Sequence, residues 1–202
     1  MLKLRKDNKQ GSVNVEAMLN DIVLKLHELI DNTDVNNTKD IKRTENYLSA
    51  LSSHIDAINR ERGFILTEQQ KSKLKRGQVV WVDFGFNIGK EFGGKHPAII
   101  LRVTSNYQSI TVIPIDGDTD DEDIINNRKK KDYWFEIPNV YGMKKMSRWA
   151  NAFRVTEISS IRVDFKNTNN TYIGYDILDQ LDELIAKYQY KPKIKSKFCA
   201  KC

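Results

Sequence analysis

Between Gly77 and about residue 155 the sequence consists of short runs rich in β-branched and aromatic residues, separated by glycine, asparagine and charged residues. Such runs are typical of β-strands, because branched and aromatic side chains pack well on a pleated surface. The runs are Gln78–Phe84, Pro97–Val103, Ile110–Ile115, Tyr133–Ile137 and one near Trp149–Val155. Short strands at this spacing predict a small, strongly bent antiparallel sheet, closed as a barrel or packed as a sandwich.

The first seventy residues have a helical pattern instead. Apolar residues recur at intervals of three and four in two segments, namely Val15, Leu19, Ile22, Leu26 and Leu29, and then Ile41, Leu48, Leu51, Ile55 and Ile58. Residues 31–38 between them are rich in capping and turn formers. We therefore expect two helices folded back as an antiparallel hairpin. It serves either as a packing or dimerisation element or as a partner-binding or autoinhibitory arm.

A third helix is expected after the strands. Its apolar face is formed by Ile177, Leu178, Leu181, Leu184, Ile185 and Tyr188. Asp176 and Asp179 near its start and Lys187 near its end suit the helix dipole. The predicted class is α+β, with a helical hairpin over residues 1–70, a β-domain with a terminal helix over 71–190, and a basic flexible tail over 191–202.

The charge balance permits a polyanionic partner without requiring one. Lys and Arg number 33 against 27 Asp and Glu, which gives a net charge of +6. No run of eighteen apolar residues occurs, and the N-terminal residues lack the apolar core of a signal peptide. We expect a cytoplasmic protein with no membrane partner.

Two motifs that suggest metal binding are incomplete. The tail carries Cys199 and Cys202 as C-A-K-C, but zinc needs four ligands and no second CxxC exists. In the acidic segment 116–123 and its continuation, a calcium loop would require Gly and Glu where Asp121 and Asn127 stand. We expect free thiols in the tail and a solvated acidic loop followed by the basic block Arg128–Lys131, with no metal bound.

The segment Gly89–Ile100, with sequence GKEFGGKHPAII, is too long and too rich in chemistry for a plain turn. Together with KRGQVVWVDF at 75–84, it resembles the opening of the PemK/MazF toxins, the ribonuclease halves of bacterial toxin–antitoxin pairs. That family has a Lys/Arg-Arg-Gly-Asp-Val strand, a G-x-E-x-G-G-x-R-P loop and an apolar strand. The resemblance continues through ITVIPID at 110–116 and MSRWANAFRV at 146–155 to the closing helix, from roughly Lys75 to Tyr188.

The resemblance implies an SH3-like antiparallel β-barrel with a C-terminal helix, usually a homodimer. It also implies an endoribonuclease that cuts single-stranded RNA, such as mRNA, without a metal or other cofactor, and a cognate antitoxin protein as partner. In this chemistry the RNA's own 2′-OH attacks the adjacent phosphorus and leaves a cyclic phosphate. The protein must supply a base, an acid and positive charge for the phosphorane.

Both catalytic positions differ from the family pattern. The family arginine before the loop proline is His96 here, and the threonine that ends the third strand is Asp116. In one interpretation His96 acts as base or acid, because an imidazole exchanges its proton near neutral pH whereas a guanidinium does not. Asp116 then fixes its tautomer or holds its charge, and Lys90 or Lys95 supplies the permanent charge. In the other, catalysis is lost, and the barrel binds a protein or nucleic acid, as CcdB-like barrels grip a topoisomerase.

Further site residues are implied by the same resemblance. Ser147 matches a family serine near the substrate groove and completes the predicted catalytic set as a hydrogen-bond donor, unless it is an ordinary strand-start hydroxyl. Asn151 follows on that strand, and Glu91 positions the loop through backbone N–H groups. Gly93 and Gly94 are expected to need a positive φ or a close approach of phosphate. Aromatic rings expected to stack RNA bases are Trp81, Phe92 and Trp149, and Lys129–Lys131 is expected either to be solvated or to flank the RNA groove.

Overall fold

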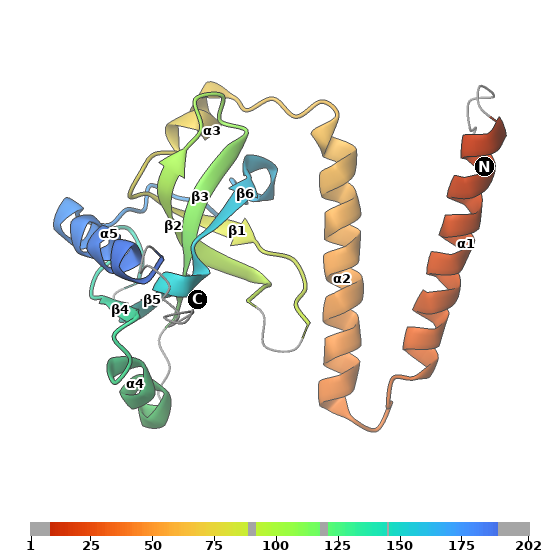
Figure 1. The fold of residues 1–202 in the computed structure, drawn as a ribbon, viewed down its shortest axis with the longest axis horizontal. Coiled ribbons are helices and arrows are strands. Elements are labelled where there is room, and N and C mark those ends of the chain that lie inside the picture. Colours follow the sequence, from red (N-terminus) through yellow and green to blue (C-terminus); the bar gives the residue numbers. More distant parts are fainter. Residues whose placement is uncertain (1–8, 89–91, 118–120, 145, 190–202) are drawn as a thin grey trace, which may run out of the picture. The chain divides into compact units, whose positions relative to one another are not determined.

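Two long helices at the N-terminal end are described in a computed structural model that covers residues 9–88, 92–117, 121–144 and 146–189. These helices, α1 (Lys9–Asp31) and α2 (Thr38–Glu61), confirm the predicted pair (Figure 1). The turn between them is held by the Asp40 carboxylate, which accepts from the Asp34 N–H at 2.9 Å. Thr33 and Thr44 share a hydrogen bond of 2.8 Å between their hydroxyls. Thr44 interrupts the apolar spacing of α2 because its hydroxyl ties the turn to the helix.

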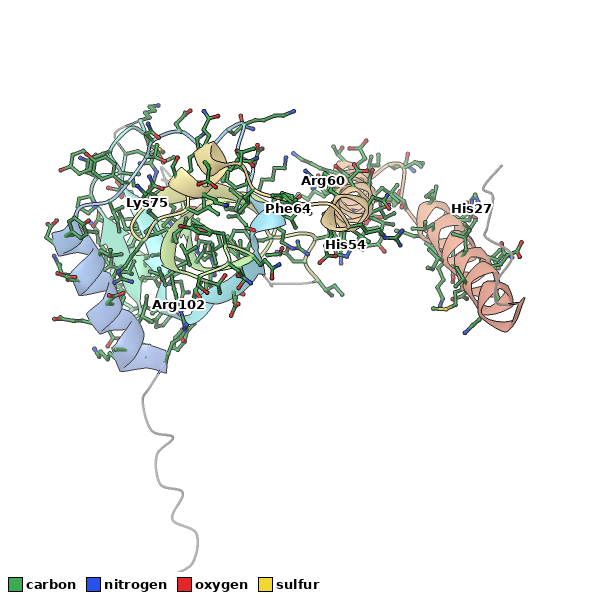
Figure 2. All side chains as sticks on the ribbon, turned by 90° about the horizontal axis from the view of Figure 1, so that it is seen from above. His27, His54, Arg60, Phe64, Lys75 and Arg102 are labelled. Atoms are coloured by element: carbon green, nitrogen blue, oxygen red, sulfur yellow. The ribbon has the colours of Figure 1, made fainter. Side chains whose placement is uncertain are left out.

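The apolar stripe of α1 is only partly covered. Leu26 and Leu29, close to the turn, are half-buried, whereas Val15, Leu19 and Ile22 are 60%, 55% and 49% exposed. Side chains stand out all around this helix in Figure 2, where His27 is labelled. The chain divides into two compact units, residues 1–53 and residues 54–202.

The second unit is built on a six-stranded antiparallel sheet. Its strands are β1 (Val79–Asp83), β2 (Lys95–Val103), β3 (Ser109–Asp116), β4 (Trp134–Ile137), β5 (Arg148–Asn151) and β6 (Thr156–Ser159). They follow the order β1-β2-β3-β5-β4, and β6 also pairs with β3 (Figure 1).

The sheet bends because β3 is shared among three neighbours. It pairs with β2 over Ile110–Pro114, with β6 over Ser109–Val112, and with β5 only through Ile115 and Asp116. A register shift between Ile100 and Arg102 adds a bulge to β2, which increases the local twist. The predicted α+β fold is therefore confirmed: a small, SH3-like antiparallel barrel follows the N-terminal helices and ends in a C-terminal helix.

Both faces of the central strands are buried, which explains why the strand sequences are continuously apolar. On one face, α5 (Tyr175–Gln189) packs Leu178 and Leu181 against a cluster that includes Val79, Ile99 and Ile113. On the opposite face, Val80, Val82, Ile100 and Ile110 pack with Leu66 and Leu74, which flank the short helix α3 (Glu68–Ser72).

The acidic segment was expected to be a solvated loop. The prediction is wrong after Asp121, where the chain forms a helix. Residues Glu122–Lys129 form α4, and the Asp121 carboxylate caps it by accepting from the N–H groups of Asp123 and Ile124 at 3.0 and 3.2 Å. Acidic residues in the first turn and Arg128 and Lys129 in the last turn complement the helix dipole. Two 3₁₀ turns, η1 (Ala152–Arg154) and η2 (Ser160–Arg162), and strand β6 were also not predicted.

Candidate functional site

His96 lies near the start of β2, between β1 and the end of β3. It pairs with Val82 on β1, and β2 pairs with β3 from Ala98 opposite Pro114 onward. His96 precedes this ladder by two residues and Asp116 follows it by two residues, so both lie at the same end of it. The barrel thus brings the two substituted positions to the same end of neighbouring strands.

The His96 imidazole is half-buried and contacts an aromatic ring from the preceding loop. The ring centroids of His96 and Phe92 are 4.5 Å apart, and Phe84 meets Phe92 edge-on at 5.1 Å. The Arg154 guanidinium, which comes from η1, lies 4.6 Å from the Phe92 centroid and 5.3 Å from that of Trp134. A titratable imidazole and a permanent cation are therefore held against one ring, in the geometry of a cation–π contact for the arginine.

Asp116 binds arginines in this structure. Its Oδ2 atom accepts from Arg154 Nη1 at 3.1 Å and from Arg128 Nη2 at 3.3 Å. The carboxylate is 17% exposed and the two guanidinium side chains 30% and 14%, so solvent screens these pairs less than surface pairs. Within the described part of the chain, no hydrogen bond joins Asp116 to His96. The carboxylate therefore positions Arg154 and does not directly set the His96 tautomer.

Gly94 meets the expectation of a positive φ, whereas at Gly93 it is the close approach of other protein atoms that excludes a side chain. Gly94 has a φ of 80°, and a Cβ placed on Gly93 would lie 2.7 Å from the Gly85 carbonyl oxygen and 1.4 Å from Asn87 Oδ1. The Gly94 N–H donates to that same Gly85 carbonyl at 2.6 Å, and its own carbonyl accepts from the Phe84 N–H at 2.9 Å. These contacts fold the loop back just before His96. Lys90 and Glu91, on the same loop, lie outside the described residues.

Lys95 is exposed beside the site but has an acidic neighbour. Its Nζ lies 3.7 Å from Asp164 Oδ2. A hydrogen bond from the Asn167 side chain, assisted by the Lys95 ammonium, holds the pKa of Asp164 below its ordinary value. Since Asp164 stays ionised at neutral pH, it offsets part of the charge that Lys95 presents to an anion.

Ser147 directly precedes β5 and Asn151 ends it, and both side chains make local contacts. The Ser147 hydroxyl donates to Glu136 Oε1 at 2.8 Å, and Asn151 Oδ1 accepts from the Phe153 N–H at 2.9 Å. The β5 register places Asn151 opposite Trp134, which contacts Arg154. Among the described hydrogen bonds, none joins either residue to His96.

One of the three rings expected to stack RNA bases is unavailable. Trp149 is only 3% exposed, so the prediction that it stacks a base is wrong. Trp81 and Phe92 are half-buried, and Arg154 covers Phe92. Trp134, which the sequence did not single out, lies 4.9 Å from the Arg128 guanidinium and joins this arginine to the site.

Sequence reasoning missed Arg128, Trp134 and Arg154 as site residues. They are separated from His96 by 32, 38 and 58 positions in the chain, and no spacing rule links them to it. A basic residue beside an aromatic one, as in Phe153-Arg154, was the available signal.

Within the described residues, no group of three His, Cys, Asp or Glu is placed to hold a metal ion. No helix in that part of the chain is long and apolar enough to cross a membrane.

A family model described as "PemK-like, MazF-like toxin of type II toxin-antitoxin system" matches residues 75–188. A crystal structure of MazF from Deinococcus radiodurans is 15% identical, with a TM-score of 0.39; the match covers 57% of this chain and 96% of that one. A MazE–MazF crystal structure from the same organism gives 16% identity, a TM-score of 0.39, and coverage of 59% and 98%. No curated protein matches the chain.

Proposed function

The chain belongs to the family of PemK-like, MazF-like toxins of type II toxin–antitoxin systems, since the family model spans residues 75–188 and hence more than half of its length. On this premise we propose that it is a metal-independent endoribonuclease that cleaves single-stranded RNA, such as mRNA, in the cytoplasm. The RNA 2′-oxygen forms a bond to the adjacent phosphorus as the bond to the 5′-oxygen breaks. The products end in a cyclic phosphate and a free 5′-OH.

One observation carries this proposal. The His96 imidazole and the Arg154 guanidinium both lie within 5 Å of the Phe92 ring centroid, at 4.5 and 4.6 Å. An imidazole exchanges protons near neutral pH, and a guanidinium keeps its charge at every relevant pH. These are the two properties that attack by a ribose hydroxyl and a developing phosphorane require.

Each residue then has a defined task. His96 takes the proton from the 2′-OH, and Arg154 stabilises the extra negative charge on the phosphorane oxygens. Asp116 holds Arg154 in place through their ion pair. The 5′-oxygen leaves with a proton from solvent or from the exposed Lys95 ammonium. Gly93 and Gly94 give the loop its close fold next to His96.

The remaining site residues act at the edge of the reaction. Ser147 donates a hydrogen bond to phosphate or to a ribose hydroxyl when it exchanges its contact with Glu136 for substrate. Asn151 supports η1, and thereby Arg154, through its cap of the Phe153 N–H. Lys90 and Glu91 keep their proposed roles of supplying positive charge and of positioning the loop. We propose a homodimer as the working assembly, with a cognate antitoxin protein as the natural partner.

The experiment is a cleavage assay on a long single-stranded RNA in the presence of a metal chelator. We expect the unaltered chain to cut, and His96→Ala to lose about 10²–10⁴-fold in rate, the usual contribution of a general base. The RNA fragments that the unaltered protein produces should end in cyclic phosphate. His54→Ala, a histidine outside this cluster, is the matched control. An unchanged rate for His96→Ala would refute the assignment, and dependence on added metal would refute the mechanism.

One observation favours a second candidate function, a CcdB-like barrel that arrests growth by binding a protein or nucleic-acid target. Asp116 is occupied by two arginines and not by His96, so the pair that replaces the family's arginine and threonine is not assembled as a His–Asp couple. Growth arrest on expression, together with intact RNA in the cleavage assay, would select this function. Arrest that His96→Ala relieves, together with fragments, would select the nuclease.

A further inference from the structure

An aromatic surface, of which Phe153 is exposed while Tyr133 and Tyr188 are half-buried, lies directly beside the candidate site. It consists of Tyr133, Phe153 and Tyr188, whose ring centroids are 5.1 Å (Tyr133 to Phe153), 5.5 Å (Phe153 to Tyr188) and 6.3 Å (Tyr133 to Tyr188) apart. Phe153 is 58% exposed, although a phenyl ring gains little from facing water. The exposed ring therefore calls for an explanation other than packing of the core.

Backbone contacts hold this aromatic surface in place. The Ala152 N–H donates to the Tyr133 carbonyl at 3.0 Å, and the Gln189 side chain donates to the Ala152 carbonyl at 3.3 Å. The Asn151 cap fixes the Phe153 N–H. Hydrogen bonds thus join η1 to the residue just before β4 and to the end of α5. Because these contacts fix the position of Phe153, a planar ligand would meet a preformed surface.

Phe153 also adjoins the catalytic arginine in sequence, and Tyr133 adjoins Trp134. The Tyr133 and Trp134 centroids are 6.4 Å apart, and Arg154 lies 5.3 Å from Trp134. Contacts between rings and cations therefore run without interruption from His96 through Phe92, Arg154 and Trp134 to the aromatic surface.

The charges around the aromatic surface suit a polyanion. Lys131 Nζ lies 6.0 Å from the Tyr133 centroid, and Lys129 and Lys130 are exposed at the end of α4. The nearby carboxylate, Asp132, is paired with Lys187 at 3.1 Å. Hydrogen bonds with Tyr188 and Lys187 hold the pKa of Asp132 below its ordinary value, so it remains an ionised, neutralised partner.

From this arrangement we infer that the Tyr133–Phe153–Tyr188 surface is a base-stacking subsite for single-stranded RNA. An unpaired base next to the cleaved linkage stacks on Phe153, and the phosphates that follow it run along Lys129–Lys131. Aromatic rings that alternate with cations bind single strands in this manner, because every base has a stacking face. The inference rests on the proposed function for the identity of its ligand, and it adds a binding site to it.

The test uses a uniformly 2′-O-methylated single-stranded RNA with a fluorescent label, since an RNA without a 2′-OH cannot be cleaved by the proposed chemistry. Binding by the full chain is measured by fluorescence anisotropy. We expect Phe153→Ser to weaken binding by roughly ten-fold or more, the usual loss when one stacked base is released. Phe153→Trp should bind at least as tightly as the unaltered chain.

The control is Tyr172→Ser. Tyr172 is 50% exposed and also belongs to a stacked pair, with Tyr141 at 4.9 Å, but among the described residues it makes no ring contact or side-chain hydrogen bond with the candidate site. We expect this variant to bind RNA as the unaltered chain does. Equal affinities for Phe153→Ser and the unaltered chain, equal losses for Phe153→Ser and Tyr172→Ser, or no RNA binding at all would each overturn the subsite. If Phe153→Ser weakened binding of an acidic antitoxin peptide but not of RNA, the surface would be assigned to a protein partner. That result would overturn the RNA subsite as well.

This binding assay is independent of cleavage. If the unaltered chain does not cut ordinary RNA but Phe153→Ser weakens binding selectively, the nuclease proposal fails and the subsite stands. If the chain cuts RNA while Phe153→Ser binds normally, the subsite fails and the nuclease proposal stands.

Discussion

The Arg154 guanidinium contacts a carboxylate and two aromatic rings. These contacts fix its position and reduce the electric field that it presents to its surroundings. The ion pair with Asp116 at 3.1 Å removes part of its field, while the rings of Phe92 and Trp134 shield it from water. Arg128 contributes a second positive charge to the same carboxylate. The cluster of Asp116 with two arginines therefore keeps a net charge of about +1, which is available to a phosphate.

The first prediction at this scale concerns Arg154 itself. Arg154→Ala should reduce single-turnover cleavage of RNA by about 10²–10³-fold, as is usual when one group that stabilises developing charge is removed. Arg154→Lys should restore part of the rate, because an ammonium keeps the charge but lacks the planar fork that stacks on Phe92. Melting curves of both variants control for folding. Cleavage by Arg154→Ala at the unaltered rate would contradict the assigned role.

The second prediction concerns Gly93. A Cβ there would lie 2.7 Å from the Gly85 carbonyl oxygen, a backbone atom that cannot easily move. Gly93→Ala should lower the free energy of unfolding by about 1–3 kcal/mol and Tm by roughly 2–10 °C. Gly63→Ala is the control, since nothing lies within 4 Å of a Cβ at that position. Equal melting temperatures for Gly93→Ala and Gly63→Ala would show that the loop relaxes around the added methyl group.

At the scale of elements, the segment before the barrel belongs to the barrel core. Leu66, which precedes α3, is 7% exposed and packs with Val80, Val82 and Ile100. A capping box between Thr67 and Gln70 starts α3 immediately afterwards. A shortened chain that begins near Lys71 would remove both, so any test of autoinhibition by the N-terminal helices should retain Leu66. The domain boundary predicted at residue 70 stays a prediction.

The third prediction compares Leu66 with its neighbour. Leu66→Ala should destabilise the protein by about 2–5 kcal/mol, because a buried leucine leaves a cavity when it is shortened. Ile65→Ala should change stability by less than about 0.5 kcal/mol, since Ile65 is 85% exposed. Chemical denaturation of both full-length variants measures the difference. A similar loss for the two variants would indicate that Leu66 does not seal the barrel.

At the scale of the whole molecule, the modest net charge of +6 hides an uneven distribution. Acidic residues gather in the first turn of α4, while Arg128 and Lys129 occupy its last turn and Lys130 and Lys131 follow. The helix separates the two charge blocks in space and sets the basic one next to Trp134. The surface proposed to bind RNA is thus more positive than the composition of the chain suggests.

The fourth prediction follows from that distribution. Binding of single-stranded RNA should become less sensitive to salt when Lys129, Lys130 and Lys131 are replaced by glutamine. The slope of the logarithm of the binding constant against the logarithm of the salt concentration should fall in magnitude by about 2, since each lost phosphate contact removes roughly 0.7. A matched triple replacement on α2, Lys39→Gln with Lys42→Gln and Arg43→Gln, should leave the slope unchanged. Equal changes for the two triple variants would mean that only overall charge matters.

The sequence alone was sufficient for elements whose evidence is local. Apolar spacing of three and four predicted α1, α2 and α5, and runs of branched and aromatic residues predicted β1 to β5. It failed for α4, because acidic residues that suggested a solvated loop include the Asp121 cap of a helix. Loop motifs also singled out His96 and the glycines beside it, whose roles in the site stay predictions.

Only the tertiary structure decided which residues accompany His96. Its neighbours are Phe92 from the same loop and, through that ring, Arg154 from η1, 58 positions along the chain. The bend of the sheet, produced as β3 changes partners from β2 to β5, sets Asp116 within reach of Arg154 and Arg128. Periodicity reports which face of an element is buried, whereas contacts between side chains of distant elements depend on how the whole sheet closes.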